Sequence, residues 1–111
     1  MFQEMLQVGS GEIKSASGTV SVSKNTSVSV DCGFKPTSIV IYADTYLDIT
    51  EVLSLYYENV PTISKTYYKY NGDGKYYQDQ YFQLTPTENG FIIKQDMSGG
   101  TGTLNYIAMK E

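Results

Sequence analysis

The side chains most able to bind a ligand or do chemistry lie in the second half of this sequence. Flat tyrosine rings can stack on the CH groups of a sugar, while neighbouring aspartate and asparagine side chains hydrogen-bond its hydroxyls. Tyrosine clusters also suit protein contact surfaces, because the side chain is stiff and carries both an apolar ring and a hydroxyl. The alternative is that these rings pack against one another across neighbouring strands. Most of the eleven tyrosines fall in one segment: Tyr56, Tyr57, Tyr67, Tyr68, Tyr70, Tyr76, Tyr77 and Tyr81.

The tetrad Asn71-Gly72-Asp73-Gly74 lies in the middle of this segment. Asn-Gly and Asp-Gly are strong hairpin signals, because these residues tolerate a positive φ. The tetrad therefore predicts a loop tip, where binding residues often sit on a rigid scaffold. We predict that the contact surface toward a partner surface or a neighbouring protein consists of Tyr67, Tyr70, Asp73, Tyr76, Tyr77 and Asp79. The competing hypothesis is that the four flanking rings of this set pack inside the sheet.

No residue pattern in the sequence selects a catalytic site. The chain has no histidine, which is the commonest general base, so its serines have no evident activator. Glu51 with Glu58, or Asp44 with Asp48, could be posed as the acid and base of a glycoside hydrolase, but no spacing selects either pair. We therefore predict a non-enzymatic protein without catalytic residues.

A metal site is also not predicted. Asn71, Asp73 and Asp79 supply oxygen ligands of the kind that calcium prefers. The segment lacks the 12-residue frame and the closing glutamate of an EF-hand, so a hairpin turn explains it better. We predict no metal and no cofactor.

Composition bounds the class of protein. At 111 residues the chain has the length of one domain, with residues 1–10 as a possible arm or flexible lead-in. The net charge of −4 is scattered and includes no basic stripe, so we expect no nucleic-acid partner. No stretch approaches the roughly 20 apolar residues of a membrane span, and the N-terminus does not resemble a signal peptide. Cys32 stands alone, which fits folding in a reducing cytoplasm, and we expect it to be a small buried hydrophobe.

Alternation of apolar and polar residues predicts an all-β fold: an antiparallel β-sandwich, jelly-roll-like, of eight to nine short strands. Residues 19–23 and 26–32 are expected to form a hairpin, and residues 44–50 a loop. Residues 38–43 are apolar on both faces and predict a central strand covered on both sides. Residues 52–57 fit either a helix or a strand, and their β-branched and aromatic content favours the strand. The other expected strands are 64–70 and 75–85, which flank the tetrad, then 90–94 and 103–109.

The core is expected where apolar residues alternate along these strands. A residue that is apolar and shares parity with apolar neighbours faces the interior of a sandwich. The predicted core residues are Ile39, Ile41, Phe82, Phe91, Ile93, Tyr106 and Ala108.

Two segments resemble small β-sandwich domains of tailed-phage and prophage tail proteins. In these domains a Gly-Phe-x-Pro strand motif comes early and a Tyr-x-Ala motif closes the chain; here they correspond to residues 33–42 and 104–110. Such domains occur in tail fibres, receptor-binding proteins and related appendages, some resemble H-type lectins, and they commonly assemble as trimers. No site residue is carried over from the resemblance.

The resemblance implies a virion component made in the bacterial cytoplasm without a signal peptide. We expect a tail or host-contacting structural protein that acts through assembly and surface binding. Its expected partners are further copies of itself, in an oligomer such as a trimer, other virion proteins, and a host surface glycan. The alternatives are a stand-alone carbohydrate-binding module and a small glycan-active enzyme.

Overall fold

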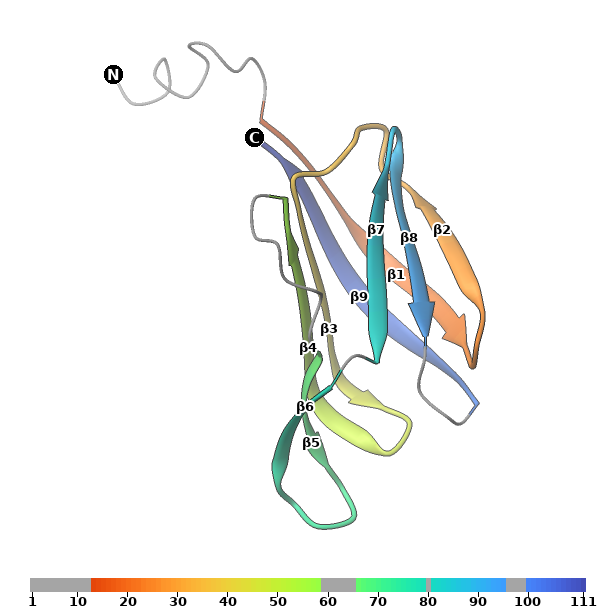
Figure 1. Cartoon of the computed structure of the whole chain (residues 1–111), viewed down its shortest axis with the longest axis vertical. Helices are drawn as coiled ribbons and strands as arrows, with labels where there is room; N and C mark the ends of the chain where they lie inside the picture. Colours follow the sequence, from red (N-terminus) through yellow and green to blue (C-terminus); the bar gives the residue numbers. More distant parts are fainter. Residues whose placement is uncertain (1–12, 59–65, 80, 96–99) are drawn as a thin grey trace, which may run out of the picture.

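The protein is described from a computed structural model, which defines residues 13–58, 66–79, 81–95 and 100–111. Within these residues the chain is all-β, in two antiparallel sheets that pack on each other as a sandwich (Figure 1). This confirms the predicted fold class. Residues 1–10, the expected lead-in, lie outside the described part of the chain. So do residues 64–65, which begin the expected strand 64–70, and residues 98–99. The strands are β1 Lys14–Ser23, β2 Ser27–Asp31, β3 Ser38–Tyr46, β4 Ile49–Tyr57, β5 Thr66–Tyr70, β6 Tyr76–Asp79, β7 Phe82–Thr87, β8 Gly90–Gln95 and β9 Thr101–Lys110.

The larger sheet has six strands in the order β1-β9-β3-β4-β5-β6. The smaller sheet has three, in the order β2-β8-β7. Figure 1 shows the smaller sheet in front of one part of the larger one, while the β5–β6 hairpin extends below the lower ends of β7 and β8. The molecule measures 50 × 25 × 24 Å, so this hairpin lies at one end of an elongated body.

The core lies between the two sheets. Six of the seven predicted core residues are buried there, and Tyr106 is half-buried and packs against the core. Its ring meets Phe91 edge-on, with centroids 5.5 Å apart, as aromatic pairs prefer. Tyr46, which was not predicted to be core, is buried beside Phe82. Cys32 is half-buried against the core and not fully buried as expected.

The predicted hairpin of residues 19–23 and 26–32 is wrong. The two strands do form, but β1 pairs with β9 of the larger sheet, while β2 pairs with β8 of the smaller one. Asn25, with φ 55°, turns the chain from one sheet to the other. Alternation along a strand reports which face is buried, but it does not report the neighbouring strand.

Residues 44–50 are not the predicted loop. Strand β3 continues to Tyr46 and β4 begins at Ile49, so only Leu47 and Asp48 form the turn. Leu47 has a φ of 55°, which leucine rarely adopts. The sequence therefore lacked the glycine or asparagine that usually signals a hairpin turn of this kind. Residues 52–57 belong to strand β4, which confirms the strand that was favoured over a helix.

Two further strand predictions need correction. Strand β3 is central, between β9 and β4, but it is covered on one side only: Ile39 and Ile41 are buried and Tyr42 is exposed. The expected strand 75–85 is two strands, since β6 pairs with β5 while β7 pairs with β8 in the other sheet. No helix in the described part of the chain is long and apolar enough to cross a membrane.

Candidate functional site

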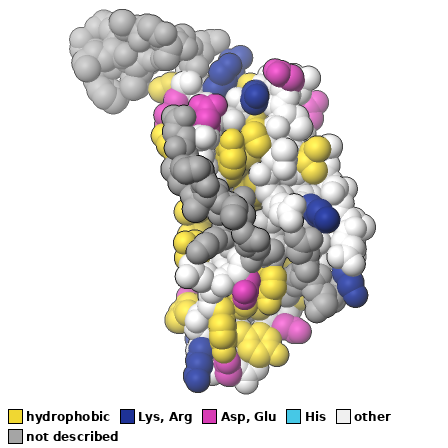
Figure 2. Space-filling model, in the orientation of Figure 1, with side chains coloured by type: hydrophobic (Ala, Val, Ile, Leu, Met, Phe, Trp, Pro, Cys, Tyr) yellow, Lys and Arg dark blue, Asp and Glu magenta, His cyan; other side chains and the backbone are white. Residues whose placement is uncertain are grey.

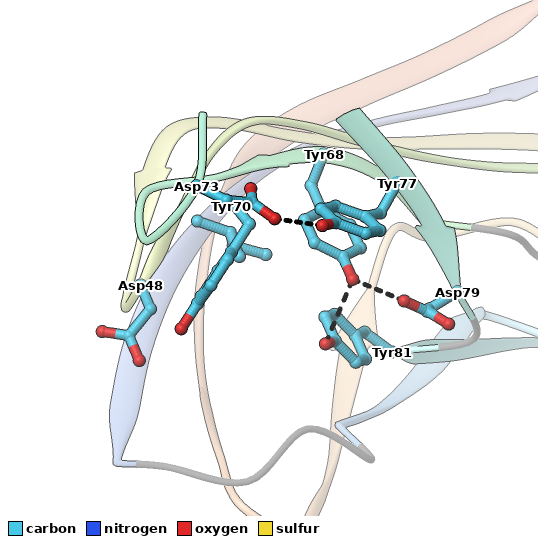
Figure 3. Close-up of a pocket in the computed structure, with 8 residues that line it drawn as sticks. Asp48, Tyr68, Tyr70, Asp73, Tyr77, Asp79 and Tyr81 are labelled. Atoms are coloured by element: carbon cyan, nitrogen blue, oxygen red, sulfur yellow. Dashed lines mark hydrogen bonds between the residues drawn. The ribbon is translucent and has the colours of Figure 1, made fainter. Parts of the chain in front are cut away.

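A pocket of about 490 Å³ opens beside the β5–β6 hairpin (Figure 3). Figure 2 shows hydrophobic and acidic side chains next to one another at this lower end of the molecule. We call this cavity the tyrosine pocket. Its walls are four tyrosines, three aspartates and one isoleucine: Tyr68, Tyr70, Tyr77, Tyr81, Asp48, Asp73, Asp79 and Ile49.

Three of these rings form a stack. The Tyr68 ring lies between Tyr77, at 5.8 Å between centroids, and Tyr81, at 5.0 Å. The planes are inclined by 21° and 25°, which is close to parallel. Strands β5 and β6 create the first contact, because Tyr68 and Tyr77 are directly opposite each other in the ladder. Tyr81 adds a ring from the segment that leads into β7.

Tyr68 is the buried centre of the pocket wall, with 4% of its side chain exposed. Its hydroxyl donates a hydrogen bond to the Asp79 carboxylate and is hydrogen-bonded to the Tyr81 hydroxyl at 3.2 Å. Burial raises the pKa of Tyr68, and the bond to Asp79 raises it further because the neutral hydroxyl is the donor. The phenol therefore stays protonated and fixes the carboxylate of Asp79 against the stack.

Tyr77 and Asp73 form a second phenol–carboxylate pair at the rim. The Tyr77 hydroxyl donates to Asp73, which also accepts the backbone N–H of Lys75 at 2.9 Å. The bond from Tyr77 lowers the pKa of Asp73 and raises that of Tyr77. Asp73 is thus held in its charged form at the mouth of the pocket.

The hairpin turn sets the place of Tyr70. Gly74, with φ 70°, closes the turn with its N–H bonded to the Tyr70 carbonyl at 2.8 Å. A Cβ on Gly72 would collide with the end of the Tyr70 ring, so glycine there lets the ring lie close to the turn. Figure 3 shows Tyr70 on one side of the cavity and the stacked rings on the other.

A bulge in β4 shapes the base of the site. The register between β4 and β5 shifts between Thr50 and Leu53, and Glu51 has a φ of 53°. Bulges bend a strand and increase its twist. Beyond the bulge, the backbone N–H of Asn71 donates to the Asp48 carbonyl at 3.1 Å, so the two hairpin turns lie together and bring Asp48 to the pocket.

The six predicted contact residues divide between two faces of the larger sheet. Tyr70, Asp73, Tyr77 and Asp79 line the tyrosine pocket. Tyr67 and Tyr76 alternate with pocket residues along β5 and β6 and point to the opposite face. Tyr76 donates a hydrogen bond of 2.9 Å to Glu51, and the Lys69 ammonium lies 5.9 Å from its ring centre.

The hypothesis that the four flanking rings pack inside the sheet is wrong. Tyr67, Tyr70 and Tyr77 are 41–44% exposed and Tyr76 is 67% exposed. The buried ring of the hairpin is Tyr68, which the predicted set did not contain.

The opposite face carries a patch of large exposed side chains, which we call the outer face. Tyr42, Leu53 and Tyr67 lie in one row across three strands, since Tyr42 is opposite Leu53 and Leu53 is opposite Tyr67. Patches of this kind often mark interaction surfaces. The outer face consists of Tyr42, Leu53, Leu55, Tyr57, Tyr67 and Tyr76, each at least 38% exposed.

Four pocket residues escaped the sequence prediction: Asp48, Ile49, Tyr68 and Tyr81. Tyr68 could have been found, because its parity along β5 places it with Tyr70. Asp48 lies in a turn that the sequence did not mark, and Ile49 follows it. Tyr81 belongs to the passage between the two sheets, which was taken as continuous strand.

The tyrosine pocket does not bring together either of the posed acid–base pairs. Asp48 reaches the tyrosine pocket, whereas Asp44, its posed partner, does not line it. Glu51 accepts the Tyr76 hydroxyl on the outer side. In the described ranges, no three acidic or cysteine side chains are grouped so that they could hold a metal ion.

Comparison of the chain with family models, with curated proteins and with solved structures finds no match.

Proposed function

We propose that this chain is a non-enzymatic surface-binding component of a phage or prophage tail, and that its tyrosine pocket holds a glycan of the host surface. The observation that carries the proposal is the stack of Tyr77, Tyr68 and Tyr81 flanked by hydrogen-bonded aspartates at one end of the molecule. The tail assignment rests on the sequence resemblance, and the ligand class rests on the pocket.

The pocket has the size and the chemistry for one or two sugar rings. A cavity of about 490 Å³ lies within the usual range of small-molecule sites, roughly 300–1,000 Å³. Tyr70 and Tyr77 are each 41% exposed, so part of each ring is accessible to the CH groups of a sugar. The aspartates retain acceptor positions for hydroxyls, because a carboxylate accepts several hydrogen bonds.

The outer face supports the assembly half of the proposal. Leu53, Leu55 and Tyr57 expose apolar area in the larger sheet on the side away from the sandwich core. Another copy of the chain, or another tail protein, would remove that area from water. We propose a homo-oligomer built through this face, with each pocket left open at its free end.

Two single variants test the pocket on a glycan array. Tyr77→Ser removes one ring of the stack and the donor to Asp73, so it should abolish the binding of any glycan that the unaltered protein retains. Tyr76→Ser removes the adjacent ring on the opposite face and is the matched control for loss of one exposed tyrosine. Equal loss in both variants, or no glycan retained by the unaltered protein, would contradict the pocket assignment.

A stand-alone carbohydrate-binding module is the second candidate, since the pocket supports it equally. The native mass in solution separates the two. An obligate oligomer supports the tail component, whereas a monomer that binds glycan supports the free module.

A further inference from the structure

The charge of the tyrosine pocket restricts the ligand that it can hold. Three of the eight described lining residues are aspartates, and none of these eight is a lysine. Within the described part of the chain, the hydrogen bonds that Asp73 and Asp79 accept come from neutral phenols and a backbone N–H. Such bonds orient a carboxylate but do not cancel its charge. The pocket is therefore a negatively charged cavity with aromatic walls.

The rings add to this electrostatic preference. The face of an aromatic ring carries negative potential and attracts a cation within about 6 Å, by roughly 0.5–2 kcal/mol depending on desolvation. Tyr70 and the stacked rings stand on opposite sides of the cavity (Figure 3). A positive group between them would lie against the exposed Tyr70 ring and have the aspartates as counter-charges. A carboxylate or phosphate in the same place would be repelled by both.

We propose that the occupant of the tyrosine pocket carries a protonated or quaternary amine. Two sources share this chemistry, an amino sugar and a choline-type headgroup. The inference deepens the proposed function, because an amino sugar is the source that agrees with glycan binding. The inference predicts that, among sugars of the same shape, the pocket binds a positively charged sugar more tightly than a neutral or a negatively charged one.

The positions of the lining residues assign a contact with the ligand to several of them. The amine lies between the Tyr70 ring and the stack. Asp48, a further lining carboxylate, lies on the other side of Tyr70 at the edge of the pocket in Figure 3 and adds its negative charge there. Asp73 and Asp79, each fixed by a tyrosine hydroxyl, accept hydrogen bonds from the ligand's hydroxyl or amine hydrogens. The low pKa of Asp73 keeps that carboxylate charged in mildly acidic conditions.

The test compares four probes by NMR titration of the full chain: glucosamine, glucose, glucuronate and choline. The titrations are run at about pH 6, where the amine is protonated and ordinary aspartates are ionised. Glucosamine should bind about tenfold more tightly than glucose, which is the effect of a cation–π contact assisted by carboxylates. Glucuronate should bind more weakly than glucose. Added salt should reduce the preference for glucosamine, because salt screens exposed charges.

Asp48→Asn tests the carboxylate contribution with almost no change in shape. It should lower the ratio of glucose Kd to glucosamine Kd severalfold. Asp44→Asn is the matched control, since it removes the same charge from the same β3–β4 hairpin at a position that does not line the pocket; this variant should keep the ratio. The amide spectrum of each variant shows that it is folded.

Each outcome bears on a different part of the idea. Glucose binding as tightly as glucosamine, or glucuronate as tightly as glucose, overturns the inference and leaves the glycan proposal standing. Choline binding without any sugar supports the cation and overturns the glycan. If no probe binds to the folded protein, both are wrong.

Discussion

Tyr68 connects the packing of the hairpin to the chemistry of the pocket. Its ring is the middle member of the stack, and its hydroxyl fixes Asp79. The adjacent Tyr67 is exposed on the other face. Two tyrosines next to each other in the sequence therefore have unrelated roles, because successive side chains of a strand point to opposite faces.

Tyr68→Phe should keep the ring stack and remove the hydrogen bonds. The expected cost is about 1 kcal/mol of unfolding free energy, the usual net value of one hydrogen bond, together with weaker ligand binding as Asp79 loses its fixed position. Urea denaturation measures the stability. Tyr42→Phe, on the outer face, is the control and should cost nothing measurable. An unchanged stability in Tyr68→Phe would mean that water replaces the phenol at Asp79 without penalty.

The raised pKa of Tyr46 predicts that the folded protein loses stability at alkaline pH. Burial raises its pKa from 10.0 to about 12, and its hydroxyl donates to Gln95 and to the Val22 carbonyl, the latter at 3.2 Å. A folded pKa above the unfolded one means that this contribution is fully present below pH 10 and is lost as the pH rises through about 12.

Ultraviolet titration of tyrosinate, followed together with circular dichroism, measures this limit. Exposed tyrosines should ionise first without loss of structure, and a late fraction should ionise together with unfolding. Tyr46→Phe should decrease the late fraction. If all the tyrosines ionise near their ordinary pKa while the sheet remains intact, Tyr46 is not buried as described.

Strand β3 holds the larger sheet together, with β9 on one side and β4 on the other. Ile41→Ala should cost roughly 2–5 kcal/mol of unfolding free energy, since it removes buried methyl groups and leaves a cavity. Val40→Ala, one residue earlier on the half-buried face, is the control and should cost clearly less. Chemical denaturation compares them, and a cost below about 1 kcal/mol for Ile41→Ala would show that the core at β3 collapses to fill the space.

The β5–β6 hairpin depends on its turn. Gly74 has φ 70°, and any residue with a Cβ pays about 1–2 kcal/mol there. Gly74→Ala should therefore lower the unfolding free energy by about that amount, and Gly74→Asn by less, because asparagine tolerates this conformation. Thermal unfolding ranks the three proteins. Equal stability of Gly74→Ala and the unaltered chain would mean that the turn adopts another conformation.

The sequence predicted strands correctly where apolar and polar residues alternate clearly or where glycine and asparagine mark a turn. It failed where the structure depends on which strands pair with each other. The tetrad at residues 71–74 marked the hairpin correctly. Leu47 and Asp48 make a turn that is shorter than the one between β5 and β6 and contains no glycine or asparagine, so that hairpin was missed, and Asp48 and Ile49 with it. The pairing of β1 with β9 joins distant parts of the chain, which local pattern does not specify.

The candidate site was half predictable for the same reason. Tyrosine content and the turn pointed to the hairpin beside which the tyrosine pocket lies. The division of Tyr67 and Tyr76 from Tyr70 and Tyr77 follows from strand parity and could have been stated in advance. Tyr81 could not, since it reaches the stack only because the chain passes from one sheet to the other there.

At the scale of the whole molecule, the three-stranded sheet packs on one side of the six-stranded one, so the outer face on the other side is left to solvent. We predict that the protein self-associates through it. Light scattering at rising concentration should show oligomers, and Leu55→Lys should shift the protein toward monomer by placing a charge in the interface.

Thr85→Lys, on an exposed position of β7 in the smaller sheet, is the matched control and should leave association unchanged. A monodisperse monomer at high concentration would contradict both the outer-face interface and the tail proposal. Equal disruption by both variants would place the interface elsewhere.

The pairing of Lys14 with Lys110 has a mechanical consequence. The first residue of β1 and the last described residues lie at one end of the molecule, and the tyrosine pocket lies at the other (Figure 1). A force that pulls Lys14 and Lys110 apart would separate β1 from β9 from this end and break the hydrogen bonds of the ladder one after another. A pull from a ligand in the pocket against either chain end runs lengthwise along the strands and loads many hydrogen bonds at once in shear. The body is therefore weak when β1 and β9 are drawn apart at this end and strong when it is loaded lengthwise between this end and the tyrosine pocket.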